Sequence, residues 1–180
     1  MTPSQLATLK ALVAAEPTLA QAVLTGQDAA IAAWLNEDAS PSYFVWRSTT
    51  PASDVMDAIT WANLTPADAA DGTAAFTNRA LACQAKQLNL QILLQGRESV
   101  ATGKTSVRGG LSDALTNVPA GAGGTLMDAG WLGAGKVKAA ITRLASRAEK
   151  ALATGSGTSG TPSALTFEGQ VSVNDAGLLR

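Results

Sequence analysis

Apolar residues recur every three or four positions along most of the chain, and this pattern predicts a mainly α-helical fold. The first helix has a well-marked start. Thr2 stands at the N-cap position, Pro3 at the first helical position and Gln5 at the third, as in a capping box. The apolar face that follows ends at Glu16, because Pro17 disfavours helical backbone in the residue before it.

The same pattern predicts further helices at 19–24, at 27–36, after Pro51, at about 66–95, at 107–118 and at about 134–152. Between them, residues 43–46 form a short apolar extended run that is expected to fill the core. The longest predicted helix, 66–95, carries five large apolar side chains: Phe76, Leu81, Leu88, Ile92 and Leu93.

The last predicted helix stops at residues 154–162, a run of Gly, Ser and Thr that ends in Pro162. Beyond this run, residues 165–173 alternate apolar and polar side chains as a β-strand does. The predicted fold is therefore a helical bundle core with a Gly/Ser-tethered C-terminal β-strand arm. The corresponding domains are residues 1–153 for the core and 154–180 for the linker and arm.

A lone strand leaves backbone N–H and C=O groups unpaired, so it completes its hydrogen bonds in another chain or in a distant part of its own. We expect the arm to add a strand to the sheet of a partner protein. The alternation places four apolar anchors on one side of the strand: Leu165, Phe167, Val171 and Val173.

The residue types exclude several kinds of chemistry. The 180 residues include no histidine, which excludes the common zinc sites and the Ser-His-Asp and Cys-His catalytic arrangements. Cys83 is the only cysteine, so an internal disulfide and a multi-cysteine metal site are excluded, and Cys83 is expected to be a small buried residue. We expect no enzymatic activity and no cofactor.

The hydropathy pattern offers no membrane segment. No stretch approaches the roughly 20 apolar residues that cross a bilayer, and the N-terminus lacks the basic and then apolar pattern of a secretory signal. We expect no membrane partner, and a location in the cytosol or in a particle assembled there.

The net charge of −1 conceals an asymmetry along the chain. Residues 1–82 carry a net charge of −5, and residues 83–150 a net charge of +5. On the predicted helix 134–152, four basic residues fall broadly on one face: Lys136, Arg143, Arg147 and Lys150. This face could meet packaged DNA or an acidic protein, and a solvated helix face is an equal alternative.

One motif invites a nucleotide-binding interpretation. Gly103-Lys104-Thr105 ends like a phosphate-binding loop, but the position of the first glycine in that pattern is occupied by Glu98, whose carboxylate would repel phosphate. A polar turn between helices is the favoured interpretation. The four tryptophans share no common spacing and are expected in the core: Trp34, Trp46, Trp61 and Trp131.

With these residues laid out, the chain resembles small virion proteins of tailed bacteriophages, and most of all head–tail connector (adaptor) proteins of the phage neck. The resembling stretches are Met1–Lys10, Phe44–Thr49, Val107–Leu115, Arg147–Lys150 and the run from 153 to 169. None of these stretches is a catalytic motif, so the resemblance indicates kinship better than it indicates a role.

The resemblance implies a homo-oligomeric ring, a dodecamer if it follows the portal, at the head–tail junction of the virion. Its implied partners are the portal protein, the next neck or tail protein, and packaged DNA passing through the channel. Two alternatives stay open within this class, a tail-completion protein and a capsid-accessory protein. The alternative of another class is a nucleotide- or nucleic-acid-binding regulator built around residues 103–105 and the basic helix.

Overall fold

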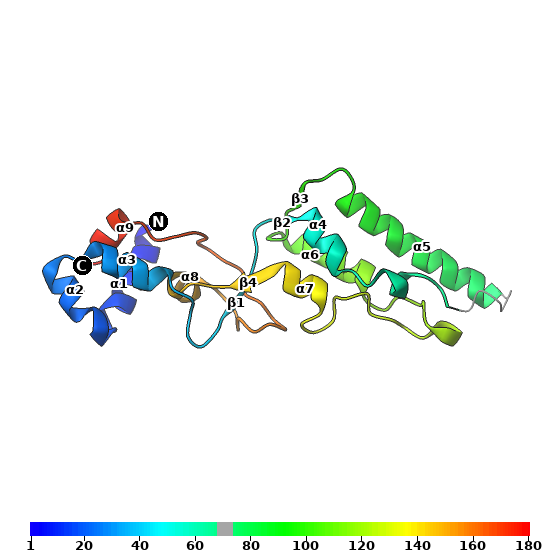
Figure 1. Ribbon diagram of the computed structural model, residues 1–180, viewed down its shortest axis with the longest axis horizontal. Coiled ribbons are helices and arrows are strands. Elements are labelled where there is room, and N and C mark those ends of the chain that lie inside the picture. Colours follow the sequence, from blue (N-terminus) through cyan, green and yellow to red (C-terminus); the bar gives the residue numbers. More distant parts are fainter. Residues whose placement is uncertain (68–73) are drawn as a thin grey trace. The chain divides into compact units, whose positions relative to one another are not determined.

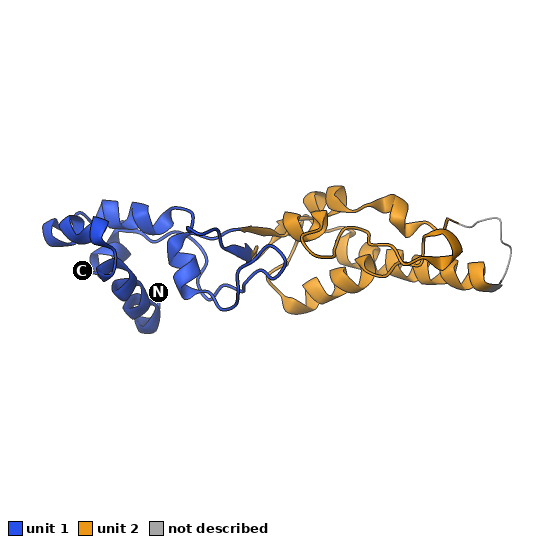
Figure 2. Ribbon diagram, turned by 90° about the horizontal axis from the view of Figure 1, so that it is seen from below, with its two compact units in different colours: residues 1–45, 144–180 blue, residues 46–143 orange. Residues whose placement is uncertain are grey.

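The computed structural model describes residues 1–67 and 74–180, and within them the chain is mainly helical, with small two-stranded pairings (Figure 1). The chain divides into two compact units, coloured separately in Figure 2. Unit 1 comprises residues 1–45 and 144–180, and unit 2 comprises residues 46–143. These bounds differ from the predicted domains 1–153 and 154–180, because the residues after 153 belong to the same unit as the first helices.

Unit 1 contains six short helical segments: α1 (Pro3–Ala14), η1 (Pro17–Leu19), α2 (Ala20–Thr25), α3 (Asp28–Asn36), α8 (Arg147–Leu152) and α9 (Val173–Gly177). The capping box predicted for the first helix is confirmed. Gln5 N donates to Thr2 Oγ1 at 3.2 Å, and Thr2 N donates to Gln5 Oε1 at 2.8 Å. The helix predicted near 19–24 ends at Gly26, whose φ of 68° is the left-handed conformation that favours glycine.

The core of unit 1 joins both ends of the chain. Side chains from α1 and α3 pack against side chains from α8, α9 and the segment before α9. The largest of these buried side chains are Leu9, Val13, Ile31, Leu35, Leu152, Val171 and Leu179. Because this core holds little aromatic area, its stability depends on many small contacts made by chain segments far apart in sequence.

Unit 2 contains α4 (Ala52–Ala58), η2 (Trp61–Leu64), α5 (Ala74–Leu94), α6 (Thr105–Leu115), η3 (Ala122–Gly124) and α7 (Lys136–Ala140). Strand β2 (Thr50–Pro51) pairs antiparallel with β3 (Ser99–Val100). The core of unit 2 lies between α4, α5, α6 and α7 and includes Val55, Leu64, Leu90, Leu111, Leu115 and Ile141.

Helix α5 is the longest described helix. Residues 66 and 67 of the helix predicted at about 66–95 are not helical, and its residues 68–73 lie outside the described residues. Its buried face carries Cys83, Leu90 and Leu94. Three other large apolar side chains of α5 are more than half exposed: Leu81 (59%), Leu88 (55%) and Ile92 (64%). Helix α5 therefore has apolar side chains on two faces, of which one is packed.

The tryptophans follow the prediction in three cases of four. Trp46 and Trp131 stack with ring centroids 6.3 Å apart in unit 2, and the Arg108 guanidinium lies 4.6 Å from the Trp46 ring centroid. Trp34 packs against the core of unit 1. Trp61 departs from the prediction, since 48% of it is exposed.

The single helix predicted at about 134–152 is wrong. Helix α7 ends at Ala140, residues Thr142–Leu144 form strand β4, and α8 begins only at Arg147. Strand β4 pairs with β1 (Phe44–Trp46), and the flanking backbone continues the pairing, with Arg47 N donating to Ile141 O and Ala145 N to Tyr43 O. Pairing with a distant segment thus overrides the helical pattern of this stretch.

The single strand predicted at 165–173 is also absent. Isolated bridges occur just before it, between Val45 and Ser163 and between Thr154 and Ala164, and Val173 instead begins helix α9. The Gly/Ser/Thr tract that precedes it packs closely against residues 43–45. Phe44 N donates to the Gly157 carbonyl at 2.7 Å, and a Cβ at Gly157, where φ is 61°, would overlap the Tyr43 ring.

Candidate functional site

The predicted partner-binding arm (residues 154–180) lies on unit 1, where a set of polar side chains holds its backbone. Asn36, at the end of α3, makes the most complete of these contacts. Val171 N donates to Asn36 Oδ1 at 2.8 Å, and Asn36 Nδ2 donates to the Val171 carbonyl at 3.0 Å. One side-chain amide thus satisfies both backbone groups of a residue that is itself buried.

Glu149 of α8 holds a second point of the arm. Its Oε2 accepts a hydrogen bond from Ser146 N at 3.1 Å, while Ser146 Oγ accepts one from Glu149 N at 3.2 Å, so the two residues form a capping box. The other carboxylate oxygen of Glu149 accepts a hydrogen bond from Gly169 N at 3.2 Å. The carboxylate, only 3% exposed, therefore fixes the start of α8 and the arm together.

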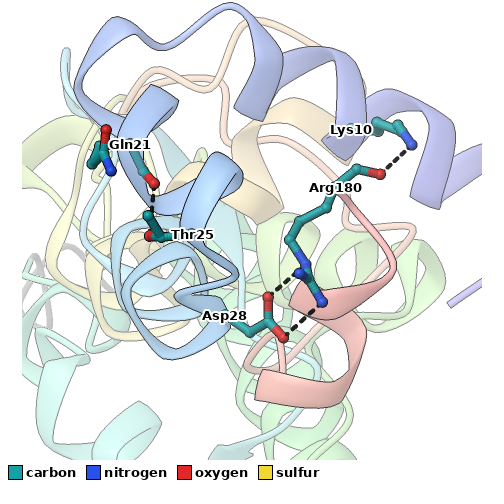
Figure 3. A network of polar contacts seen from close by, with 5 residues as sticks. All are labelled: Lys10, Gln21, Thr25, Asp28 and Arg180. Carbon is teal, nitrogen blue, oxygen red and sulfur yellow. Dashed lines mark hydrogen bonds and ion pairs between the residues drawn. The ribbon is translucent and has the colours of Figure 1, made fainter.

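A third group of contacts fixes α9 and the last residues (Figure 3). Arg180 Nε lies 2.9 Å from Asp28 Oδ1, and Lys10 donates to the Arg180 carbonyl. The Arg180 guanidinium also fits against Gly26, where an added Cβ would lie 2.8 Å from Arg180 Nη1. Gly26 thus serves both the left-handed turn after α2 and the approach of Arg180.

The four predicted anchors lie in different environments. Val171 is buried in the core of unit 1, and Phe167 packs partly buried against it. Leu165 is half-buried, whereas Val173 is 51% exposed at the first position of α9. These side chains therefore do not form the continuous apolar side of a strand. All four belong to a segment that packs on unit 1 of its own chain.

Unit 1 also contains a partly open cavity of about 530 Å³ next to α8. Its lining residues are Leu12, Glu16, Trp34, Ala39, Ser40, Arg147, Lys150 and Ala151. Two of the predicted basic residues thus line it, and both are engaged. Arg147 lies 4.5 Å from the Trp34 ring centroid and 2.8 Å from Glu37 Oε2. Lys150 Nζ donates to the Pro41 carbonyl at 3.2 Å.

Glu16, which also lines the cavity, is ionised at neutral pH. Its pKa is lowered chiefly by the hydrogen bond from the Thr18 hydroxyl, then by that from Thr18 N, with a smaller contribution from the positive charge of Arg147. The cavity therefore mixes two cations with carboxylates, and its charged groups mostly hold the chain's own backbone.

The other two predicted basic residues belong to unit 2, Lys136 at the start of α7 and Arg143 in β4. The common helix face proposed for Lys136, Arg143, Arg147 and Lys150 does not exist, because β4 separates α7 from α8. A helical spacing argument fails wherever the helix is interrupted.

The segment that resembles a phosphate-binding loop is filled by its own chain. Gly103 N, which would face a phosphate, donates to the Ser48 carbonyl at 2.9 Å, and a Cβ at Gly103 would lie 3.0 Å from Ser48 Cα. Arg108 donates to the carbonyls of Thr102 and Gly103 at 2.9 and 2.6 Å. Burial lowers the Arg108 pKa, while its contacts keep the guanidinium turned toward the loop. The arrangement is that of a closed turn.

Over residues 1–67 and 74–180, no group of three or more acidic, cysteine or histidine side chains is placed to hold a metal ion. Within the same residues, no helix has both the length and the apolar character to cross a bilayer. Cys83 is 1% exposed in the core of unit 2, as predicted for a small buried residue, and this burial raises the pKa of its thiol.

The residues that hold the arm were not among the predicted site residues. Asn36 and Asp28 act across more than 130 positions of sequence, and nothing local marks them. Glu149 did carry a local signal, since Ser146-Arg147-Ala148-Glu149 has the spacing of a capping box and would have placed a helix start there.

Comparison with known proteins adds no relative. No family model, no curated protein and no solved structure matches this chain.

Proposed function

We propose that this chain is a structural subunit of a tailed-phage virion, a head–tail connector that forms a ring between the portal and the next neck or tail protein. Support comes first from the resemblance, whose stretches fall on defined elements of both units: the start of α1, strand β1, helices α6 and α8, and the arm. These elements belong to the packed parts of each unit.

The observation that carries the proposal is the use of polar groups in the candidate site. Asn36, Glu149, Arg147, Lys150 and Arg108 each hold backbone of the same chain. Side chains that hold the backbone of their own chain stabilise its fold, and this use supports a structural role. The exposed apolar face of α5 then supplies a surface suited to assembly.

The rival of another class, a nucleotide- or nucleic-acid-binding regulator, finds less support. It requires open backbone N–H groups near Gly103 and a continuous basic helix. The Gly103 N–H is occupied by the Ser48 carbonyl, and strand β4 interrupts the helix.

The proposal is tested by electron microscopy of particles from a phage that lacks this gene, with the gene restored from a plasmid as the control. Tailless heads that have lost their DNA would support the portal-side connector. Full heads beside finished free tails would assign the protein to the later joining step, and complete but fragile particles would make it a capsid accessory. Normal, stable particles would overturn the structural role.

A further inference from the structure

Helix α5 carries two apolar stripes on opposite faces. At about 100° per residue, the stripe of Cys83, Leu90 and Leu94 lies roughly 160° around the helix from that of Leu81, Leu88 and Ile92. The first stripe packs into the core of unit 2, whereas the second is more than half exposed at each of its three large side chains. We call Leu81, Ala85, Leu88 and Ile92 the outer stripe. Its spacing of four, three and four residues is that of a helix seam that packs against another element.

The outer stripe has an uncharged border. Between residues 80 and 96 the only charged side chain is Lys86, and it is turned away to the carbonyls of Asp113 and Thr116. Gln84, Asn89 and Gln91 flank the stripe instead. A solvated helix face usually carries charges, so an apolar stripe bordered by amides is suited to burial against another protein surface.

A second exposed apolar surface lies on the same unit. It is a groove of about 310 Å³ between α5 and the segment of α4 and η2, lined by Met56, Trp61, Gln87, Leu90, Gln91, Leu94 and Gln95. Met56 is 40% exposed and Trp61 48%, and the Trp61 indole N–H is satisfied by the Met56 carbonyl at 3.0 Å. The groove therefore presents mainly apolar surface, and the indole N–H of Trp61 in its lining is already paired.

We propose that the outer stripe of one copy of this chain seats in the groove of a second copy. The sizes agree. Apolar cavities of roughly 150 Å³ accept a benzene-sized group, so the groove has room for about two aliphatic side chains. Leu88 and Ile92 rise about 6 Å apart along α5, and the part of α5 that lines the groove, Gln87 to Gln95, rises about 12 Å.

The occupant is a second copy because the two surfaces match each other. Both are apolar and uncharged, and both are bordered by glutamines, whose side chains donate and accept equally well. Pairing outer stripe with outer stripe would leave Met56 and Trp61 uncovered. Seating the stripe of one copy in the groove of the next covers both kinds of exposed surface with a single type of contact.

A contact between two different patches of the same protein is heterologous, and such contacts repeat head to tail into a ring when the rotation closes. The contact itself is inferred from the two surfaces, and only the closure of a ring rests on the proposed function. The contact is small beside the roughly 800 Å² that each partner buries in a standard interface, so we expect association in the micromolar range that strengthens as copies are linked.

Crosslinking of the purified chain tests the contact, in a Cys83→Ala background whose helical content is first checked by circular dichroism. With a short bismaleimide, the double variant Met56→Cys/Leu88→Cys is expected to give a ladder of dimers, trimers and larger species. A mixture of the two single variants is expected to stop at dimers. Dimers from Leu88→Cys alone would show stripe-to-stripe pairing and overturn the proposal, as would the absence of crosslinks in the double variant.

A matched pair of variants tests the same contact without crosslinks. The mass of the native chain, measured by light scattering, is expected to rise above 18.2 kDa with concentration. Leu88→Ser is expected to stay monomeric, while Leu132→Ser, equally exposed on unit 2 but outside both surfaces, is expected to associate like the native chain. Equal association of both variants would overturn the proposal. The gene deletion tests the proposed function on phage particles, whereas crosslinking and light scattering test the contact on the purified chain. Either proposal can therefore fail while the other holds.

Discussion

Asn36 and Val171 exchange two hydrogen bonds, Val171 N to Asn36 Oδ1 at 2.8 Å and Asn36 Nδ2 to Val171 O at 3.0 Å. The pair has the same donor and acceptor pattern that a neighbouring strand would offer one residue. A single side chain at the end of α3 thereby pairs both backbone groups of Val171, the residue at which the arm enters the core of unit 1.

Asn36→Asp is expected to destabilise unit 1 by about 1–3 kcal/mol, the cost of leaving a buried polar group unpaired. The new carboxylate keeps the acceptor for Val171 N but places a second oxygen against the Val171 carbonyl. Urea unfolding, together with amide hydrogen exchange at residues 165–180, measures the effect. Asn174→Asp, an exposed change of the same chemistry, should stay within about 0.5 kcal/mol, and equal effects of the two variants would contradict the role of Asn36.

Glu149→Gln is expected to free the arm at Gly169, at a cost of about 1–3 kcal/mol. The amide retains one acceptor oxygen, so it cannot accept from both Ser146 N and Gly169 N. Faster hydrogen exchange at Gly169 or at the first turn of α8 is the expected signature. Glu98→Gln, an exposed carboxylate of unit 2, serves as the control. Unchanged exchange in both segments of the Glu149 variant would count against the double role.

The Asp28–Arg180 ion pair is expected to contribute little, because the two side chains are 23% and 43% exposed. A double-mutant cycle with Asp28→Ala and Arg180→Ala should give a coupling of about 0.2–1 kcal/mol at low salt that shrinks as salt screens the charges. Asp28→Ala alone should cost more than the coupling, since Asp28 also lies in the first turn of α3. A coupling indistinguishable from zero at low salt would show that the ion pair does not help to hold α9.

Cys83 is expected to make stability depend on pH in the alkaline range. Burial raises its thiol pKa in the folded chain, so the folded state keeps the proton after the unfolded state has lost it. This stabilisation is fully present below the unfolded thiol pKa of about 8.5 and is lost as pH rises further, by up to about 1.4 kcal/mol per pH unit. Denaturant unfolding between pH 7.5 and 9.5 measures it, and Cys83→Ala should flatten the dependence. If the stability of Cys83→Ala fell equally steeply with pH, other titrating groups would be the cause.

A local signal in the sequence predicted the start of the first helix. The Thr2 capping box depends on neighbouring residues only, and it is as predicted. The periodicity of α5 was equally clear, but with apolar side chains on opposite faces it could not say which face is buried. That choice depends on where α6 and η2 pack, which no local pattern contains.

The errors came from contacts between distant residues. Residues 142–144 leave the helical pattern because β1 pairs with them. Residues 165–172 form no strand, and Asn36 and Glu149 bind their backbone at Val171 and Gly169. The alternation of apolar and polar residues at 165–173 is typical of a strand in isolation. In the structure, side chains of the same unit bind the backbone at Gly169 and Val171 instead.

The Gly157–Tyr43 contact means that the glycine- and serine-rich tract is defined by the order of its residues and not only by their kinds. The residue facing the Tyr43 ring has no room for a side chain, while the Tyr43 hydroxyl binds the Gly155 carbonyl at 2.9 Å and lies 2.8 Å from Ser163 Oγ. A shuffled tract of identical composition and length would bring a bulkier residue to position 157. For protein engineering, this makes the tract a poor place for a tag or an inserted spacer, although its composition suggests the opposite.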